Sequence, residues 1–237
     1  MASKGTVVDI LRNSAERDPA AAAVLSTDPG EAMTYGELAG TVGAFGAELR
    51  AHGVGPSDAV LVDLPNGPAM LVATVATMCV AVCAPMNGAY TRPELEALAA
   101  DVGAVAVVTP PGSTGPAAQL AEERGLVRVE FELWGTAPGG PNEGLPVAPD
   151  EGAVALLLHT AGTTARPKQV PLTHANLAAA AGNVVDSLHL TPADRCLNVM
   201  PLFHSHGLLG AALSTLCAGA SIVCARGMDP RRFLRWA

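Results

Sequence analysis

Apolar residues recur along the chain with two periods, one typical of amphipathic helices and one typical of buried strands. After Thr34, apolar residues follow at every third or fourth position as far as Leu49. Thr34 and Glu37 stand at the spacing of a capping box, and Gly53 supplies a stop signal. The pattern between Thr34 and Gly53 therefore predicts an amphipathic helix.

The segments that follow alternate between helix-like and strand-like patterns. Residues 64–91 carry no charge and predict a buried helix that leads into a strand near residues 80–84. A second capping box, made by Thr91 and Glu94, predicts another helix. Further apolar or alternating runs predict strands at 59–64, 104–109, 126–133 and 153–159. This order predicts an α/β fold in which helices are layered on mostly parallel sheets.

Residues 135–150 interrupt the alternation, because eight of these sixteen residues are glycine or proline. Such a composition is typical of a loop or a linker. We therefore expect a first α/β subdomain at residues 1–134, a loop or linker at 135–150 and a second α/β part at 151–237. A long surface loop within one domain is the alternative that the pattern leaves open.

The uncharged segment approaches the length of a membrane span. Its prolines at positions 65, 68 and 85 and its many small residues argue against a span. The N-terminus lacks the long apolar stretch of a secretory signal. The five cysteines lie mostly in apolar runs and fit free thiols in a reducing compartment. The sequence therefore predicts a cytoplasmic protein without a membrane span.

The formal net charge of −8 argues against nucleic acid as a partner, because Lys4 and Lys168 are the chain's lysines and its arginines are scattered until the last few residues. Cys79 and Cys83 are four residues apart, which would place both on one face of a helix. No second pair of Cys or His follows at ligand spacing, so we expect no metal there.

Residues 159–169, HTAGTTARPKQ, combine small residues and hydroxyls with one lysine. The stretch fails the P-loop pattern at two fixed positions, which Pro167 and Gln169 occupy. A P-loop also runs directly into a helix, whereas an extended segment here separates Lys168 from a helix expected to begin near His174. Threonine hydroxyls, turn amides and the cations still suit phosphate, and a solvated surface turn is the alternative.

The region resembles the phosphate loop of the AMP-forming adenylate-forming ligases, the acyl-CoA synthetases and their relatives. The matching positions are Thr160, Gly162, Thr163, Thr164, Pro167, Lys168, Val170, Leu172, Thr173 and His174. Residues 201–208, PLFHSHGL, match a second motif of that family about thirty residues later. Residues 33–70 and 84–109 are also similar, so the chain resembles the front of the large N-terminal domain of such ligases.

The resemblance implies ATP-dependent activation of a small carboxylic acid to an acyl-adenylate, followed by transfer to coenzyme A. ATP, Mg²⁺ and coenzyme A are the implied cofactors. The implied ATP phosphate-binding residues are Thr160, Gly162, Thr163, Thr164 and Lys168. The implied acyl-pocket residues are His204, His206 and Gly207. The two histidines make the second motif most similar to malonyl-CoA and oxalyl-CoA synthetases, which favours a dicarboxylic acid.

Three positions depart from the family pattern, since Ala161, Ala165 and Gln169 replace a serine and two glycines. Family members are also about twice as long, and their C-terminal domain carries the catalytic lysine, so no catalytic residue is assigned here. One hypothesis is a truncated or partial ligase. The alternative is a half-length, catalytically degenerate homologue that acts as a binding or assembly partner. Either form would expose apolar surface and is expected to self-associate or to bind a partner chain.

The histidines allow one further interpretation. On a strand, His204 and His206 would face the same way and could bind a metal. No third ligand is near in sequence, Asp194 being the closest carboxylate, so we expect no metal site. His159 at a strand end and His174 in the first turn of a helix are predicted to be structural.

Overall fold

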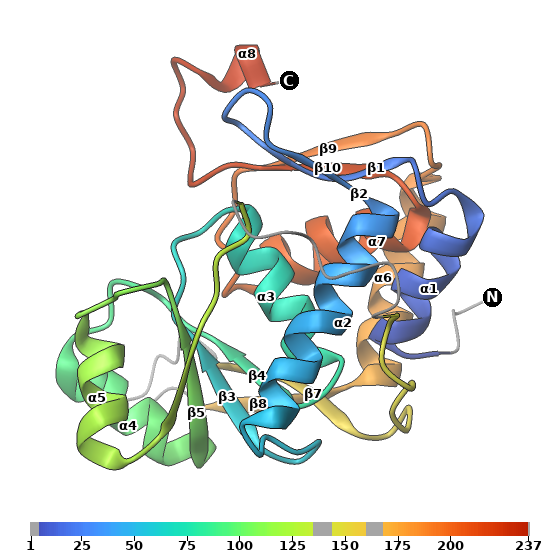
Figure 1. The fold of residues 1–237 in the computed structure, drawn as a ribbon. Helices are drawn as coiled ribbons and strands as arrows, with labels where there is room; N and C mark the ends of the chain where they lie inside the picture. The colour runs from blue at the N-terminus through green and yellow to red at the C-terminus, as the bar shows by residue number, and fades with distance from the viewer. Residues whose placement is uncertain (1–4, 135–143, 160–167, 237) are drawn as a thin grey trace.

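Two β-sheets form the framework of the computed structural model, which describes residues 5–134, 144–159 and 168–236 (Figure 1). The larger sheet has the order β6 (Val127–Glu130), β5 (Ala104–Thr109), β3 (Ala59–Val62), β4 (Val82–Pro85), β7 (Val154–His159) and β8 (Gln169–Thr173). The smaller sheet has the order β2 (Ala32–Thr34), β1 (Ala22–Ser26), β10 (Ser221–Cys224) and β9 (Arg195–Asn198). Only β8 and β2 pair antiparallel to their neighbours, so both sheets are mostly parallel.

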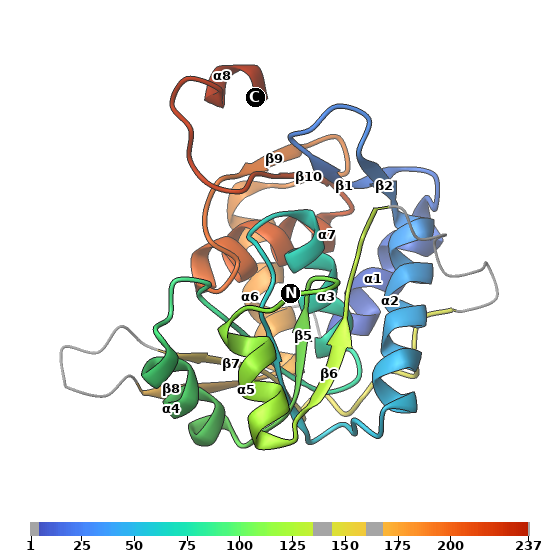
Figure 2. The same ribbon diagram turned by 60° about the vertical axis from the view of Figure 1, so that its left-hand side comes forward.

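Helices pack between the two sheets and on the outer face of the larger one (Figures 1 and 2). The inner layer contains α1 (Val7–Arg17), α2 (Tyr35–Ala51), α3 (Pro68–Met78), α6 (His174–Leu188), η1 (His206–Leu213) and α7 (Ser214–Ala218). On the outer face, α4 (Arg92–Val102) and α5 (Pro116–Arg124) form a second apolar cluster with β3, β5 and β4. A short helix, α8 (Phe233–Trp236), projects beyond the smaller sheet. The layered α/β fold predicted from the sequence is confirmed.

The capping signals in the sequence identify the helix starts correctly. Thr34 and Glu37 make the reciprocal bonds of a capping box at the start of α2, and Thr91 and Glu94 do so at the start of α4. The uncharged segment forms α3, whose residues Met70–Met78 are all buried. None of the helices in the described residues is long and apolar enough to cross a membrane. The helices α1, α5, η1 and α7 were not predicted.

One strand is shorter than its pattern indicates. The alternation over 126–133 predicts a longer strand than β6, which ends at Glu130. The amide of Phe131 still donates to the Thr109 carbonyl oxygen, but its ring packs edge-on against Phe45 with 4.6 Å between centroids. Burial of this aromatic side chain against α2 draws the chain away from the sheet.

Cys79 and Cys83 do not share a helix face, so this prediction is wrong. Cys79 caps the C-terminus of α3, whereas Cys83 lies in β4. The helix ends between them and the chain turns into the larger sheet. Both thiols are free, and burial raises the pKa of Cys79 to about 12.

The sheets do not follow the division of the chain at residues 135–150. β1 and β2 lie before that segment and pair with β10 and β9, which lie after it. β7 and β8 likewise extend a sheet whose other strands precede the segment. Each sheet therefore contains strands from both sides of residues 135–150. The division into parts at 1–134 and 151–237 stays a prediction.

Candidate functional site

The two motif segments lie at the ends of strands in the two sheets. Residues 160–167 connect the C-terminal end of β7 to the start of β8, and the second motif follows the C-terminal end of β9. In sheets with parallel strands, ligands bind at the carboxyl ends of the strands. The fold therefore presents both motifs where a ligand site is expected.

Strand pairing fixes the two ends of the predicted phosphate loop. Thr160, Gly162, Thr163 and Thr164 lie outside the described residues, whereas Lys168 is described and exposed. His159 is paired with Gln169 in the antiparallel β7–β8 ladder, so the loop begins and ends at neighbouring strand positions.

The helix that follows does not begin at the loop. β8 intervenes, and α6 begins only at His174, after a capping box between Thr173 and Asn176. This arrangement confirms the sequence argument against a P-loop, whose phosphate site needs a helix N-terminus directly after the loop.

Gln169 occupies an unstrained position. It is the first residue of β8, and its side chain is exposed. Among the non-glycine residues that the structure describes, positive φ occurs at His189 and not at Gln169. A glycine is therefore not required at position 169 for backbone conformation, and the substitution costs no strain there.

His159 ties the end of β7 to the outer helix layer. Its Nε2 atom lies 3.2 Å from Oδ2 of Asp101 on α4, and its side chain is 12% exposed. His174 is buried at the start of α6, where its Nδ1 accepts a hydrogen bond of 3.3 Å from the Val7 amide. Both contacts support the structural roles that the sequence predicts for these histidines.

The second motif forms a turn that leads into a π-helix. The His204 amide donates to the Pro201 carbonyl oxygen at 3.2 Å, and η1 begins at His206. His204 and His206 are exposed, while Leu202 and Leu208 are buried beneath them. The motif thus anchors its leucines in the core and presents both imidazoles at the surface.

The idea of a metal bound by two histidines on one strand is wrong in its geometry. His204 lies in a turn and His206 at a helix start, so the alternation of a strand does not orient them. In the described part of the chain, no group of three or more His, Cys, Asp or Glu side chains is arranged to hold a metal ion.

Gly207 allows the turn to close. A Cβ atom at this position would lie 2.3 Å from the Pro201 carbonyl oxygen, a separation that no real Cβ contact shows. The Gly207 carbonyl oxygen also accepts a 3.2 Å hydrogen bond from the side chain of Asn198, the last residue of β9. The sequence motif predicts a pocket role for Gly207, and the structure shows a steric one.

Asn66 is a site residue that the sequence analysis missed. Its Oδ1 accepts from the Leu202 amide at 2.8 Å, and its Nδ2 donates to the Ala225 carbonyl oxygen at 2.9 Å. It thereby joins the segment after β3 to the second motif and to the residue after β10. A polar residue shortly after a buried strand was the available signal, but its partners are 136 and 159 residues away.

Asp63 lies at the same end of β3, and burial raises the pKa of its carboxyl group. Among the described residues, its side chain has no hydrogen-bond partner. Because its pKa is raised in the folded state, the folded protein holds this proton more tightly than the unfolded chain does. The free energy of unfolding therefore falls as pH rises from about 3.9, the usual pKa of an Asp, through the raised folded-state pKa. The ionised carboxylate therefore destabilises the folded state at neutral pH.

We expect Asp63→Asn to increase the free energy of unfolding at pH 7, with a difference from the parent chain that shrinks toward pH 4. Urea denaturation at the two pH values measures this difference. Asp28→Asn, at an exposed carboxylate, is the control and should change little at either pH. Equal effects of the two substitutions would contradict the assignment to burial.

Comparison with known proteins agrees with this geometry. Residues 11–237 match the family described as AMP-binding enzyme. A probable CoA ligase of Humulus lupulus is 34% identical over 234 residues, covering 94% of this chain and 44% of that protein. An oxalate–CoA ligase of Arabidopsis thaliana is 33% identical over 234 residues, covering 92% of this chain and 44% of that protein.

Solved structures show the same fold. The crystal structure of ATP-bound MatB from Rhodopseudomonas palustris has a TM-score of 0.85 and 28% identity to this chain. The matched region covers 96% of this chain and 47% of the MatB chain. The chain thus spans less than half the length of each of these three relatives. Because the family match extends over nearly all of its residues, the chain belongs to the AMP-binding enzyme family.

Proposed function

We propose that this chain is part of an ATP-dependent, AMP-forming ligase that converts a small carboxylic acid into its CoA thioester. The observation that carries the proposal is the pairing of His159 with Gln169, which brings the two ends of a threonine-rich loop together beside Lys168. The similarity to proteins named CoA ligases supports the same reaction class.

The proposed reaction has two steps. A carboxylate oxygen of the acid attacks the α-phosphorus of ATP, and pyrophosphate leaves with the bonding electron pair. The sulfur of coenzyme A then attacks the acyl carbon, and AMP leaves. Mg²⁺, bound with ATP, would neutralise phosphate charge.

Within this scheme, Lys168 is placed to stabilise the negative charge that develops on pyrophosphate, and Thr160, Thr163 and Thr164 supply hydroxyl donors. Gly162 allows close approach of the backbone to a phosphate. These roles are carried over from the family pattern. They are consistent with the exposed position of Lys168 immediately before β8.

For the acid, we propose a small dicarboxylate. His204 and His206 are both exposed on the turn that follows β9, and either imidazole can donate a hydrogen bond to a second carboxylate. Gly207 keeps the turn closed so that these side chains stay on its surface. The name of the Arabidopsis relative, an oxalate–CoA ligase, favours the same class of acid.

The proposal is tested by acid-dependent exchange of labelled pyrophosphate into ATP, using the complete protein and a series of small mono- and dicarboxylic acids. We expect exchange with dicarboxylic acids of two to four carbons. Calorimetry with ATP is the companion measurement. Absence of ATP binding at millimolar concentration would remove the ligase proposal.

A second candidate is a homologue that has lost catalysis and serves as a binding or assembly partner. The substitutions Ala161 and Ala165 favour it, because the first removes a hydroxyl donor and the second replaces a glycine of the family pattern. In that case the chain is expected to self-associate or to bind a second protein, which light scattering would reveal.

Restoring the family residues separates the two candidates. We expect Ala161→Ser combined with Ala165→Gly to tighten ATP binding about tenfold, through a regained hydroxyl donor and the return of the family glycine. Gln169→Gly alone is the matched control and should give no gain, because Gln169 already has ordinary strand geometry. Calorimetry on each variant measures the effect, and an unchanged affinity after double restoration would show that these positions do not weaken the site.

A further inference from the structure

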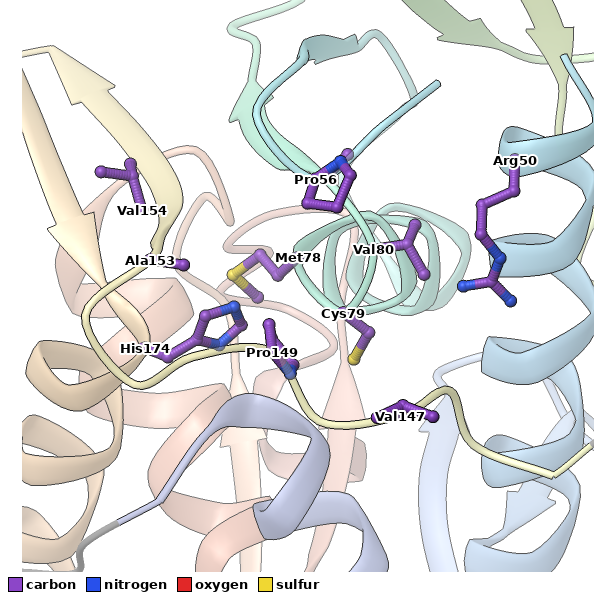
Figure 3. Close-up of a pocket in the computed structure, with 11 residues that line it drawn as sticks. Arg50, Pro56, Met78, Cys79, Val80, Val147, Pro149, Ala153, Val154 and His174 are labelled. Atoms are coloured by element: carbon purple, nitrogen blue, oxygen red, sulfur yellow. The ribbon is translucent and has the colours of Figure 1, made fainter. Parts of the chain in front are cut away.

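A cavity of about 150 Å³ lies at the ends of β7 and β8 opposite to His159 and Lys168 (Figure 3). Its wall contains Val154, the first residue of β7, and His174, which directly follows β8. The five steps from Val154 to His159 span about 16 Å at roughly 3.3 Å per strand residue. The cavity is therefore separate from the proposed ATP site.

Most of the cavity wall is apolar. Met78 contributes from the end of α3, Val80 and Ala81 from the connection to β4, and Pro149 and Val154 from the opposite side. The cavity opens to solvent beside Val147 and Arg50, which are both exposed. Its volume is about that of a cavity that holds a benzene-sized molecule. The thiol of Cys79 also lines the wall, and because burial raises its pKa to about 12 it stays neutral and does not repel an anion.

His174 offers an unpartnered hydrogen-bond donor to this space. The residue is 2% exposed, and its Nδ1 accepts the hydrogen bond from Val7, so the neutral ring carries its hydrogen on Nε2. Burial lowers the pKa of the imidazole and favours this neutral form. Among the described residues, none accepts a hydrogen bond from Nε2. Of the residues that the structure describes, Thr41 Oγ1 and Thr74 Oγ1 are the fully buried side-chain polar atoms without a partner, and Nε2 of His174 is not one of them. It is therefore open to the cavity, where it can donate to a ligand acceptor.

Arg50 supplies the charge at the other end. Figure 3 shows its side chain on α2, across the cavity from His174 and beyond Val80. It is exposed and is the one residue with a full positive charge among those that line the cavity, all of which are described. The negative charge of Asp9 raises the pKa of His174, and this carboxylate is already paired with Arg12 at 2.9 Å. The cavity thus has a cationic rim, an apolar middle and a neutral donor at its inner end.

We propose that this cavity binds a short linear oxo acid, of a size limited by the cavity volume of about 150 Å³. The carboxylate pairs with Arg50 at the rim, the aliphatic chain contacts Met78 and Val80, and the keto oxygen accepts a hydrogen bond from Nε2 of His174. No covalent step is involved. The inference goes beyond the proposed ligase function and depends on neither ATP nor coenzyme A.

The experiment titrates the full chain with 6-oxoheptanoate in the absence of nucleotide, following the methyl resonances of Met78, Val80 and Val154. We expect saturable shifts at these methyls. Heptanoate lacks the keto oxygen and 2-heptanone lacks the carboxylate, and each is expected to bind at least about fivefold more weakly, because each loses one polar contact.

Two variants test the walls. Arg50→Gln should weaken 6-oxoheptanoate about fivefold or more and leave 2-heptanone unchanged, because Arg50 contacts only the carboxylate. Arg235→Gln, at an exposed arginine of α8, is the matched control and should have no effect. Ala153→Leu fills the cavity and should abolish the methyl shifts.

Three results would overturn the inference. One is the absence of saturable shifts at tens of millimolar of 6-oxoheptanoate. Another is equal affinity for all three compounds. The third is a set of shifts centred on residues 201–208, which would place the acid at the proposed acyl pocket instead. Pyrophosphate exchange is measured separately, so failure here does not affect the ligase proposal.

Discussion

Replacement of Lys168 by alanine is expected to lower ATP–pyrophosphate exchange by the complete protein about a hundredfold or more, the size of loss typical when one preorganised charge-stabilising donor is removed. Lys168 is the one lysine in the two motif segments, and it lies next to the paired strand ends that bound the phosphate loop. Exchange of labelled pyrophosphate into ATP at saturating acid measures the loss directly. The exchange rate should fall more than the affinity for ATP, since charge on pyrophosphate grows as the bond to the α-phosphorus breaks.

Two controls make the result specific. Lys4→Ala removes the only other lysine of the chain and should leave exchange unchanged. Lys168→Arg keeps the charge with different geometry and should retain part of the activity. Retention of most exchange in Lys168→Ala would mean that the cation is merely solvated, and the phosphate-loop assignment of this segment would have to be abandoned.

The sequence predicted the elements whose signals are local. The capping boxes at Thr34 and Thr91, the apolar runs of β5 and β7, and the start of α6 all depend on residues within a few positions of one another. The assembly of the smaller sheet could not be predicted in this way. Val24 of β1 pairs with Ile222 of β10, and nothing in either short strand specifies a partner so distant in sequence.

The same distinction between local signals and distant contacts applies to the residues of the candidate site. Lys168 was singled out from residue type as a cation beside a threonine-rich turn, whereas the pocket roles of His204 and His206 came from the resemblance of their motif to the ligase family. Asn66 was not predicted, because its role consists of two backbone contacts made by a residue in another part of the chain. The donor of His174 was missed for a related reason, since its orientation is fixed by Val7 on α1, a helix that was itself not predicted.

Gly207→Ala is expected to lower the free energy of unfolding by about 1–3 kcal/mol, the usual cost of forcing an extra methyl group into a packed position. The methyl carbon would lie 2.3 Å from the Pro201 carbonyl oxygen and 3.0 Å from that of Met200, and backbone atoms cannot rotate away as a side chain can. Relief requires movement of the turn that presents His204 and His206. The KM for the acid should therefore rise in the complete protein, while the affinity for ATP changes less.

Gly210→Ala is the matched control for this prediction, because it adds the same methyl group to the same π-helix. The nearest atom to a Cβ at position 210 is Nδ1 of His206 at 3.8 Å, which is ordinary contact. Urea denaturation should show Gly210→Ala to be as stable as the parent chain or more stable, since alanine favours helix more than glycine does. Equal stability of the two variants would show that the turn adjusts to the methyl group, and Gly207 would then be unnecessary for holding the two histidines at the surface.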